Sequence, residues 1–146
     1  MKTYKGRYTP KHPQKYVGDR NNIVYRSLWE RTAFRWCDDN PIVVKWASEP
    51  FHIPYICETD NRAHKYWPDL LIEFENGNRY LIEIKPDKET KPPKGTRNTK
   101  RLLRETLTYA KNTSKWKAAK SWCEDRGIEF QIWTEKTLRS LGMKIL

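Results

Sequence analysis

A β-hairpin predicted at the centre of the chain constrains the fold more than any other feature. Residues 70–74 and 79–85 are rich in β-branched and aromatic side chains, and Glu75-Asn76-Gly77-Asn78 separates them. Strand-forming runs around an Asn-Gly pair are typical of an antiparallel hairpin. A two-residue turn would pair Asp69 with Ile84, whereas a type I turn with Gly77 in the left-handed region would pair Asp69 with Glu83.

Side-chain burial selects between these two registers. The second register places Glu73 opposite Arg79 as a cross-strand ion pair. It also gathers six apolar side chains on one face, namely Leu70, Ile72, Phe74, Tyr80, Ile82 and Ile84. A slip of one residue would mix the two faces, so burial favours this register. The opposite face then carries Asp69, Glu83 and Lys85 together at the mouth of the hairpin.

The predicted group of Asp69, Glu83 and Lys85 has the chemistry of a metal-dependent phosphodiesterase. Two facing carboxylates repel each other unless a cation lies between them, and Mg²⁺ prefers carboxylate oxygens and water. Lys85 could hold a water molecule or offset negative charge that develops on a phosphate. An ordinary group of surface ions at a strand end is the alternative interpretation.

The segments before the hairpin predict one helix and two strands. Ser27 is a candidate N-cap with Glu30 at the capping-box spacing, and Asn40-Pro41 ends the helical pattern. The expected elements are an irregular basic N-terminal arm over 1–22, a helix over 27–38, strands over 42–46 and 51–56, and a polar loop over 58–65.

The segments after the hairpin complete a single α/β domain over 1–146. Gly127 is a natural helix stop. The expected elements are a basic, proline-rich loop over 86–100, helices over 102–110 and 113–125, a strand over 128–133 and a helix over 134–141. This order predicts a mixed sheet flanked by helices.

The charge balance indicates a polyanionic partner. Lysine and arginine number 29 against 18 acidic residues, a net charge of +11, which favours nucleic acid over a membrane surface. The apolar runs are far shorter than the ~20 residues of a membrane span. Three cysteines without a C-x-x-C motif argue against a disulfide scaffold and a classical zinc site, so we expect a reducing cytoplasm. The first ten residues lack the apolar run of a secretory signal.

The residues around the hairpin resemble a known nuclease signature. Pro68-Asp69 followed by Glu83-Ile84-Lys85 is similar to the PD-(D/E)xK motif, whose superfamily has a restriction-endonuclease-like core of order αβββαβ. Members often carry a further metal-binding glutamate on the first helix, and Glu30 matches that position. Residues 25–30 and 64–69 also resemble the TnsA-type transposon endonucleases.

A resemblance to the head-completion nucleases of tailed phages extends over nearly the whole chain. The stretches that carry it are 10–11, 15–19, 25–30, 46–49, 53–55, 82–86, 89–93 and 115–119. It implies a metal-dependent DNA endonuclease that acts in head completion and head–tail joining during virion assembly. The implied partners are DNA and phage head or neck proteins, with no membrane. The implied location is the host cytoplasm, with the virion as an alternative.

The resemblance also implies a set of site residues. The catalytic residues would be Glu30, Asp69, Glu83 and Lys85. The metal would be Mg²⁺, for which Mn²⁺ can substitute, held by Glu30, Asp69, Glu83 and the backbone carbonyl of Ile84. Glu30 could instead serve only as the capping-box glutamate of Ser27.

Basic residues of the 86–100 loop and its continuation are candidates for phosphate contacts, because the loop begins directly after Lys85. They are Lys88, Lys91, Lys94, Arg97, Lys100 and Arg101, with Lys2, Lys5, Arg7, Lys11, Lys15 and Arg20 of the arm as further candidates. Additional site candidates are Glu49, His64 and Gln131, each of which an ordinary solvated or strand residue would also explain. The tryptophans are expected in the core, with base stacking as the alternative for Trp67.

Two other functions fit the same pattern. One is a DNA-end-binding head assembly protein without turnover, and the other is a transposase- or recombination-type nuclease subunit. Four charged residues converging in one place, Glu30, Asp69, Glu83 and Lys85, favour an active nuclease over the first of these.

Overall fold

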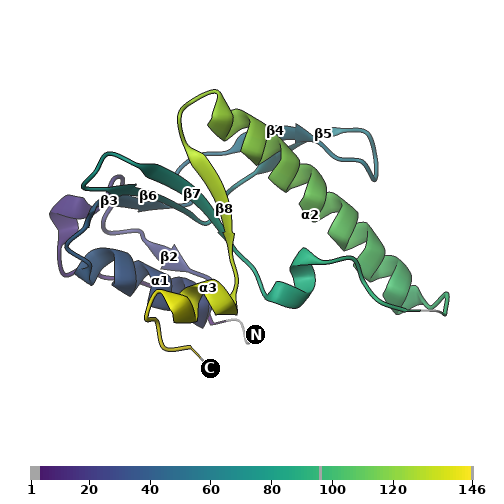
Figure 1. The fold of residues 1–146 in the computed structure, drawn as a ribbon, viewed down its shortest axis with the longest axis horizontal. Helices are drawn as coiled ribbons and strands as arrows, with labels where there is room; N and C mark the ends of the chain where they lie inside the picture. The colour runs from purple at the N-terminus through teal and green to yellow at the C-terminus, as the bar shows by residue number, and fades with distance from the viewer. Residues whose placement is uncertain (1–3, 96, 146) are drawn as a thin grey trace.

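A four-stranded mixed sheet forms the centre of the computed structural model, which describes residues 4–95 and 97–145 (Figure 1). Its strands are β3 (Val43–Ser48), β6 (Leu70–Phe74), β7 (Arg79–Ile84) and β8 (Glu129–Trp133), in the order β3-β6-β7-β8. The first two pairs are antiparallel, whereas β7 and β8 are parallel. A parallel pair needs a long crossover, and helix α2 (Lys100–Glu124) provides it. The prediction of a mixed sheet with flanking helices is confirmed.

The β6–β7 hairpin has the predicted turn. Gly77 has a φ of +86°, and the Phe74 N–H donates to the Asn78 carbonyl at 2.9 Å. Glu73 pairs with Arg79, and the ladder continues to Leu70 opposite Ile82. Asp69 lies just beyond this ladder, where its N–H donates to the Ile82 carbonyl at 3.0 Å. The register that burial selects is therefore confirmed as far as Leu70, and Asp69 is a bend residue directly before β6.

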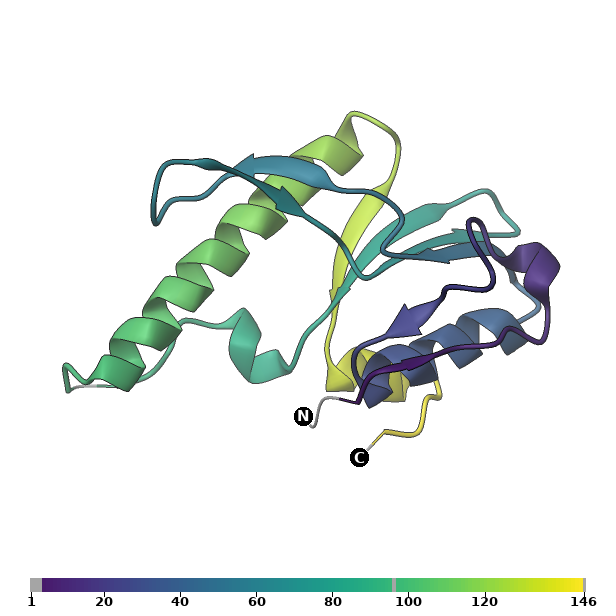
Figure 2. The ribbon, with the colours of Figure 1, turned by 180° about the vertical axis from the view of Figure 1, so that it is seen from behind.

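Helices and small sheets cover both faces of the central sheet (Figures 1 and 2). On one face, Ile72 and Ile82 pack with residues of α1 (Leu28–Asp39) and α3 (Glu135–Ser140). On the other face, Leu81 packs with Trp116 and Ala119 of α2 and with the hairpin of β4 (Ile53–Ile56) and β5 (Ala63–Tyr66). The end of β7, which carries Glu83 and is followed by Lys85, thus lies between two separate hydrophobic clusters.

The described part of the N-terminal segment is mostly irregular, as expected, and it is held against the core. Strand β1 (Gly6–Arg7) pairs with β2 (Val24–Tyr25), and Pro13–Lys15 form a 3₁₀ helix. The segment is anchored by the buried Asp38, which accepts hydrogen bonds from the Tyr8 hydroxyl at 2.7 Å and from the N–H groups of Lys11 and His12 at 2.7 and 2.9 Å.

Lys15 of the same segment binds protein instead of facing solvent. Its ammonium donates to the carbonyls of Cys37, Asp38 and Asn40 at 2.6, 2.8 and 2.8 Å. A cation is favourable at the C-terminus of a helix, where carbonyls lack partners. Lys15 therefore caps α1, and the interpretation of it as a phosphate contact is wrong. Lys2, another candidate of the arm, lies outside the described residues.

Two further expectations differ from the structure. The region expected as a polar loop over 58–65 contains β5, which pairs with β4 from Ile53–Tyr66 to Ile56–Ala63. The two helices expected over 102–110 and 113–125 are one continuous helix, because no glycine or proline interrupts 100–124. Thr113 and Ser114 donate to the Ala110 carbonyl within that helix and cap nothing.

The other predicted elements are confirmed to within about two residues. Ser27 caps α1 by accepting the Glu30 N–H at 3.2 Å. Gly127 ends α2 with a φ of +66°, and Thr134 caps α3. Among the described residues of the 86–100 region, a short 3₁₀ helix, Asp87–Thr90, precedes the start of α2. No helix within the described parts of the chain is long and apolar enough to cross a membrane.

Candidate active site

Glu83 is a buried carboxylate held by donors from two other elements. The Tyr66 hydroxyl, at the end of β5, donates to Glu83 Oε2 at 2.5 Å. The Trp116 indole N–H, on α2, donates to the same oxygen at 3.3 Å. Glu83 and Tyr66 are 8% and 3% exposed, so these contacts lie in the interior. One carboxylate oxygen is thereby fixed, and Oε1 remains for another ligand.

Asp69 is held beside Glu83 by the backbone of the next strand. The Ile84 N–H donates to Asp69 Oδ2 at 2.7 Å. The Asp69 carboxylate therefore binds the backbone of the residue that follows Glu83, the residue it was expected to face. Burial raises the pKa of Asp69 well above its ordinary value, and the negative charges of Glu83 and Glu30 raise it further. The close approach of the two carboxylates is the arrangement that the hairpin register predicts.

Glu30 reaches the same region from the first turn of α1. Its Oε2 accepts the Arg26 N–H at 3.1 Å, and its Oε1 lies 3.4 Å from the Ser27 hydroxyl, which donates to it. Burial raises the pKa of Glu30, and the charge of Glu49 adds to this effect. Glu30 therefore takes part in the helix cap and also lies close enough to Asp69 to influence its pKa.

In the part of the chain that the structure describes, the three carboxylates form no ion pair. Over residues 4–95 and 97–145, no side-chain nitrogen of lysine or arginine lies within 4.0 Å of a carboxylate oxygen of Glu30, Asp69 or Glu83. Buried carboxylates without counter-charges are costly, and proteins pair them with cations or metals. The donor set, made only of oxygen atoms, suits a hard divalent cation.

Lys85 and Lys115 bring two cations to the edge of this carboxylate group. Lys85 is half-buried directly after β7, and its N–H donates to the Trp133 carbonyl at 3.0 Å. Lys115, on α2, has its ammonium 5.7 Å from the ring centroid of Tyr66. Burial lowers the pKa of Lys115, Glu83 opposes this shift, and Lys85 adds to it.

Tyr66, Trp116 and Lys115 are site residues that sequence reasoning missed. Tyr66 directly follows the expected polar loop over 58–65, and no sequence pattern indicated a position for its hydroxyl. Trp116 was expected as part of an apolar stripe, and it does pack in the core while its N–H binds Glu83. The available signal was that all three residues lie in stretches that carry the family resemblances, 64–69 and 115–119.

Glu49 lies at the rim of the site. Its N–H donates to the Asp69 carbonyl at 3.0 Å, and its φ of +43° is unusual for a residue other than glycine. The Arg26 side chain forms an ion pair with it at 2.8 Å. The two hydrogen bonds from Arg26 to Glu49 raise the Arg26 pKa, and the charges of Glu30 and Asp69 add to the shift. The structure therefore brings Glu49 near the carboxylates.

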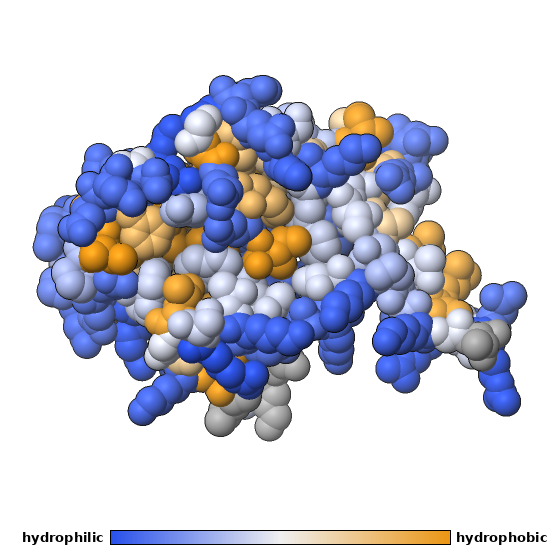
Figure 3. Space-filling model, viewed as in Figure 1, coloured by the Kyte–Doolittle hydropathy of each residue, from blue (hydrophilic) through white to orange (hydrophobic). Residues whose placement is uncertain are grey.

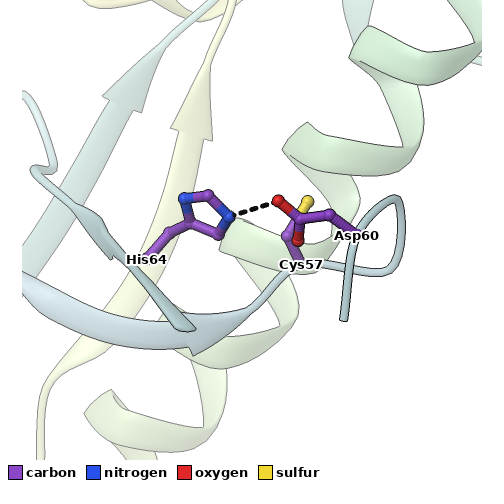
Figure 4. A group of neighbouring side chains, drawn as sticks. All are labelled: Cys57, Asp60 and His64. Carbon is purple, nitrogen blue, oxygen red and sulfur yellow. Dashed lines mark hydrogen bonds and ion pairs between the residues drawn. The ribbon is translucent and has the colours of Figure 1, made fainter. Parts of the chain in front are cut away.

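His64 is engaged elsewhere. Its Nε2 lies 2.8 Å from Asp60 Oδ2, and Figure 4 shows this pair beside Cys57. The donor atoms of these three residues all lie within 4.8 Å of one another, a grouping that could hold a metal ion. The Cys57 thiol also lies 3.1 Å from the Thr59 hydroxyl. The ring of His64 pairs with Asp60, and its place among the site candidates stays a prediction.

Gln131 is on the wrong face of the sheet for the expected role. It is the parallel partner of Ile82, whereas Ile132 is the partner of Glu83. Residues directly opposite share a face, so Gln131 points toward α1 and α3. Its amide oxygen accepts the Trp133 indole N–H at 2.9 Å, and its amide nitrogen donates to Glu129.

The basic loop residues are exposed, and two of them already form ion pairs. Lys91 binds Asp87 at 3.1 Å, and Arg101 binds Glu105 at 2.9 Å. Hydrophilic side chains cover most of the face in Figure 3, including much of the projecting end of α2. Trp67, expected in the core, is half exposed beside His52.

Two comparisons with known proteins find similar sequences. The family model described as TnsA-like endonuclease N terminal matches residues 40–135, which include Asp69, Glu83 and Lys85. The head completion nuclease of Enterobacteria phage T4 is 44% identical to the chain over 146 residues, and the match covers 97% of each protein.

Proposed function

The chain belongs to the head completion nuclease family, and from this premise we propose that it is a metal-dependent DNA endonuclease acting in phage head completion and head–tail joining. The observation that carries the proposal is the convergence of Glu30, Asp69 and Glu83 beside Lys85, with no ion pair to any of the three carboxylates among the described residues. In this role the protein would work in the host cytoplasm or in the virion, with DNA and head or neck proteins as partners.

The carboxylate group fits a Mg²⁺ ion. One oxygen of Asp69 and one of Glu83 are occupied by hydrogen-bond donors, which orients the carboxylates and leaves their second oxygens available. Glu30 and the carbonyl of Ile84 are the additional ligands that we propose, and the same oxygen donors would accept Mn²⁺. A bound ion would lower the pKa of a coordinated water and polarise a phosphate oxygen.

The protein's own groups supply orientation and positive charge. Tyr66 and Trp116 fix the plane of the Glu83 carboxylate, and the Ile84 N–H fixes Asp69. Lys85 would orient the attacking water or offset the charge that gathers on the phosphate in the transition state. Fixed groups of this kind do not need to reorganise as the charge develops, which is what lowers the barrier.

The basic surface would hold the substrate. A net charge of +11 favours DNA, and the loop that leaves Lys85 carries the proposed phosphate contacts. Those residues are Lys88, Lys91, Lys94, Arg97, Lys100 and Arg101. The two hydrophobic clusters share the central sheet, which supports treating residues 1–146 as one nuclease domain.

Incubation of the purified protein with circular and with linear DNA, in Mg²⁺ or in chelator, tests this function. Conversion of the circle to nicked or linear forms in Mg²⁺ alone is the expected result, since an endonuclease needs no free end. DNA binding without cleavage in both Mg²⁺ and Mn²⁺ would instead favour a DNA-end-binding assembly protein.

A further inference from the structure

We propose that a groove between the segment after β7 and helix α2 binds a single strand of DNA next to the cleavage site. The identity of the ligand rests on the proposed nuclease function, whereas the groove itself is a feature of the fold. Its volume is about 670 Å³. Lys88 and Lys94 lie on one wall, and Arg104, Tyr109 and Asn112 lie on the other.

Both walls of this groove run directly out of the candidate active site. The first wall begins at Asp87, two residues after Lys85. The second wall ends at Asn112, which lies one helical turn before Trp116, the residue whose indole binds Glu83. A strand with one phosphate at the carboxylates would therefore have its neighbouring nucleotides in the groove.

Asn112 contributes an amide to the wall of the groove. It is 7% exposed and lines the groove. In the described part of the chain, no protein group forms a hydrogen bond with its side-chain amide. Its amide atoms are not among the buried side-chain atoms that lack a partner, so they reach solvent in the groove and are open to a ligand. An amide can donate and accept, which suits the edge of a base or a sugar–phosphate oxygen.

The cations and the aromatic ring of the groove suit a single strand. Lys91 and Arg101 are neutralised by Asp87 and Glu105. Lys88, Lys94 and Arg104 form no ion pair with any other described residue, which leaves them for phosphates. Tyr109 is half-buried on the same wall and offers a ring for stacking. Basic grooves with aromatic rings are typical of proteins that bind single-stranded DNA.

The size of the groove favours one strand over a duplex. A cavity of several hundred Å³ encloses a ligand of drug size, comparable to one or two nucleotides. A double helix, whose major groove alone is about 12 Å wide, cannot enter it. The expected occupant is therefore a frayed or overhanging strand at a DNA end or junction.

Fluorescence anisotropy in chelator, where no cleavage occurs, separates strand binding from catalysis. Labelled oligo-dT and a blunt duplex are titrated with the wild-type protein and with the variants Tyr109→Ala, Arg104→Ala and Asn112→Ala. Lys117→Ala, an exposed residue of the same helix that does not line the groove, is the matched control. Loss of stacking should weaken oligo-dT binding at least about fivefold. Duplex binding should change less than about twofold, because none of the three substituted residues is among the proposed phosphate contacts of the duplex.

A cleavage assay in Mg²⁺ completes the test. A duplex with a single-stranded overhang should be cut faster than a blunt one, and Tyr109→Ala should remove that preference. Equal oligo-dT affinity for all four variants and the wild type would contradict the proposal that the groove binds a single strand, even if the protein cuts DNA. A loss of duplex binding in the variants, without a loss of oligo-dT binding, would also contradict it. Loss of oligo-dT affinity in a protein that cuts nothing would support the groove and contradict the nuclease function.

Discussion

The hydroxyl of Tyr66 donates to Glu83 Oε2 at 2.5 Å, in the interior between β5, β7 and α2. Trp116 binds the same oxygen from the other side. Two donors on one oxygen restrict rotation of the carboxylate and leave Oε1 as the oxygen available to a cation. Tyr66 is therefore a positioning residue of the proposed metal site.

Tyr66→Phe should reduce cleavage about 10- to 100-fold, because removing a side chain that hydrogen-bonds to a metal ligand has effects of this size. The Mg²⁺ concentration needed for half-maximal rate should rise as well. Cleavage rates over a Mg²⁺ titration measure both quantities, with Tyr55→Phe, another buried tyrosine of the β4–β5 hairpin, as the control. An unchanged rate and an unchanged Mg²⁺ dependence would remove Tyr66 from the site.

Lys85→Ala should abolish cleavage while leaving metal binding intact or stronger. The substitution deletes the cation that orients water or offsets phosphate charge, and it also removes a like charge from the neighbourhood of the metal. Calorimetric titration with Mn²⁺ and a DNA cleavage assay measure the two effects separately. Lys45→Ala, at an exposed position of β3, is the control. Weakened metal binding in Lys85→Ala would contradict the assigned role.

Asp38→Asn should destabilise the protein at neutral pH and much less in acid. Burial alone would raise the pKa of Asp38, but hydrogen bonds from Tyr8, Lys11 and His12 outweigh it and lower the pKa. A carboxyl whose folded-state pKa is depressed contributes stability above its unfolded value of about 3.9, and that contribution is lost as the pH falls through the folded value.

Thermal melts of Asp38→Asn and wild type at pH 7 and at about pH 3 measure this effect. The melting temperatures should differ at pH 7 and converge in acid. Asp39→Asn is a matched control, because the neighbouring Asp39 is exposed and forms only a surface ion pair with Lys11 at 3.7 Å. A difference that is equal at both pH values would show that the charge of Asp38 is not what stabilises the segment.

Binding of duplex DNA should depend steeply on salt. Neutralising ~6 phosphates would lower the affinity about a thousandfold between 50 and 200 mM salt. Replacing Lys88, Lys91 and Lys94 by alanine should weaken binding and flatten the slope, with Lys91 contributing least because Asp87 already pairs with it. Anisotropy over a salt series measures the slope, and circular dichroism checks the fold. A flat response of the wild type would remove the electrostatic basis for binding.

The hairpin and its carboxylates could be predicted because their signals are local. Gly77 permits the turn, and the alternation of Ile82, Glu83 and Ile84 fixes which side chains face the core. The same arithmetic of strand faces, applied across β7 and β8, would have placed Gln131 away from Glu83. That pairing is parallel and non-local, so its register was not available from the sequence.

The remaining differences come from contacts between distant residues. Asp38 organises Tyr8, Lys11 and His12 across separations of 26 to 30 residues, and no periodicity in the arm indicates such an anchor. Strand β5 has a polar composition, and it forms because β4 is available as its partner. Tyr66 reaches Glu83 only as a result of that pairing.

Cleavage of circular DNA by Asp69→Asn tests the active-site assignment most directly, with Asp39→Asn as the exposed control. The amide keeps an acceptor for the Ile84 N–H but removes a charge that burial, Glu83 and Glu30 all disfavour. In chelator the variant should melt no lower than the wild type and should bind duplex DNA equally well. Each 1 kcal/mol added to the free energy of unfolding would raise the melting temperature by about 2–4 °C. In Mg²⁺ it should cut no DNA. Cleavage by the folded variant at the wild-type rate would contradict the assignment.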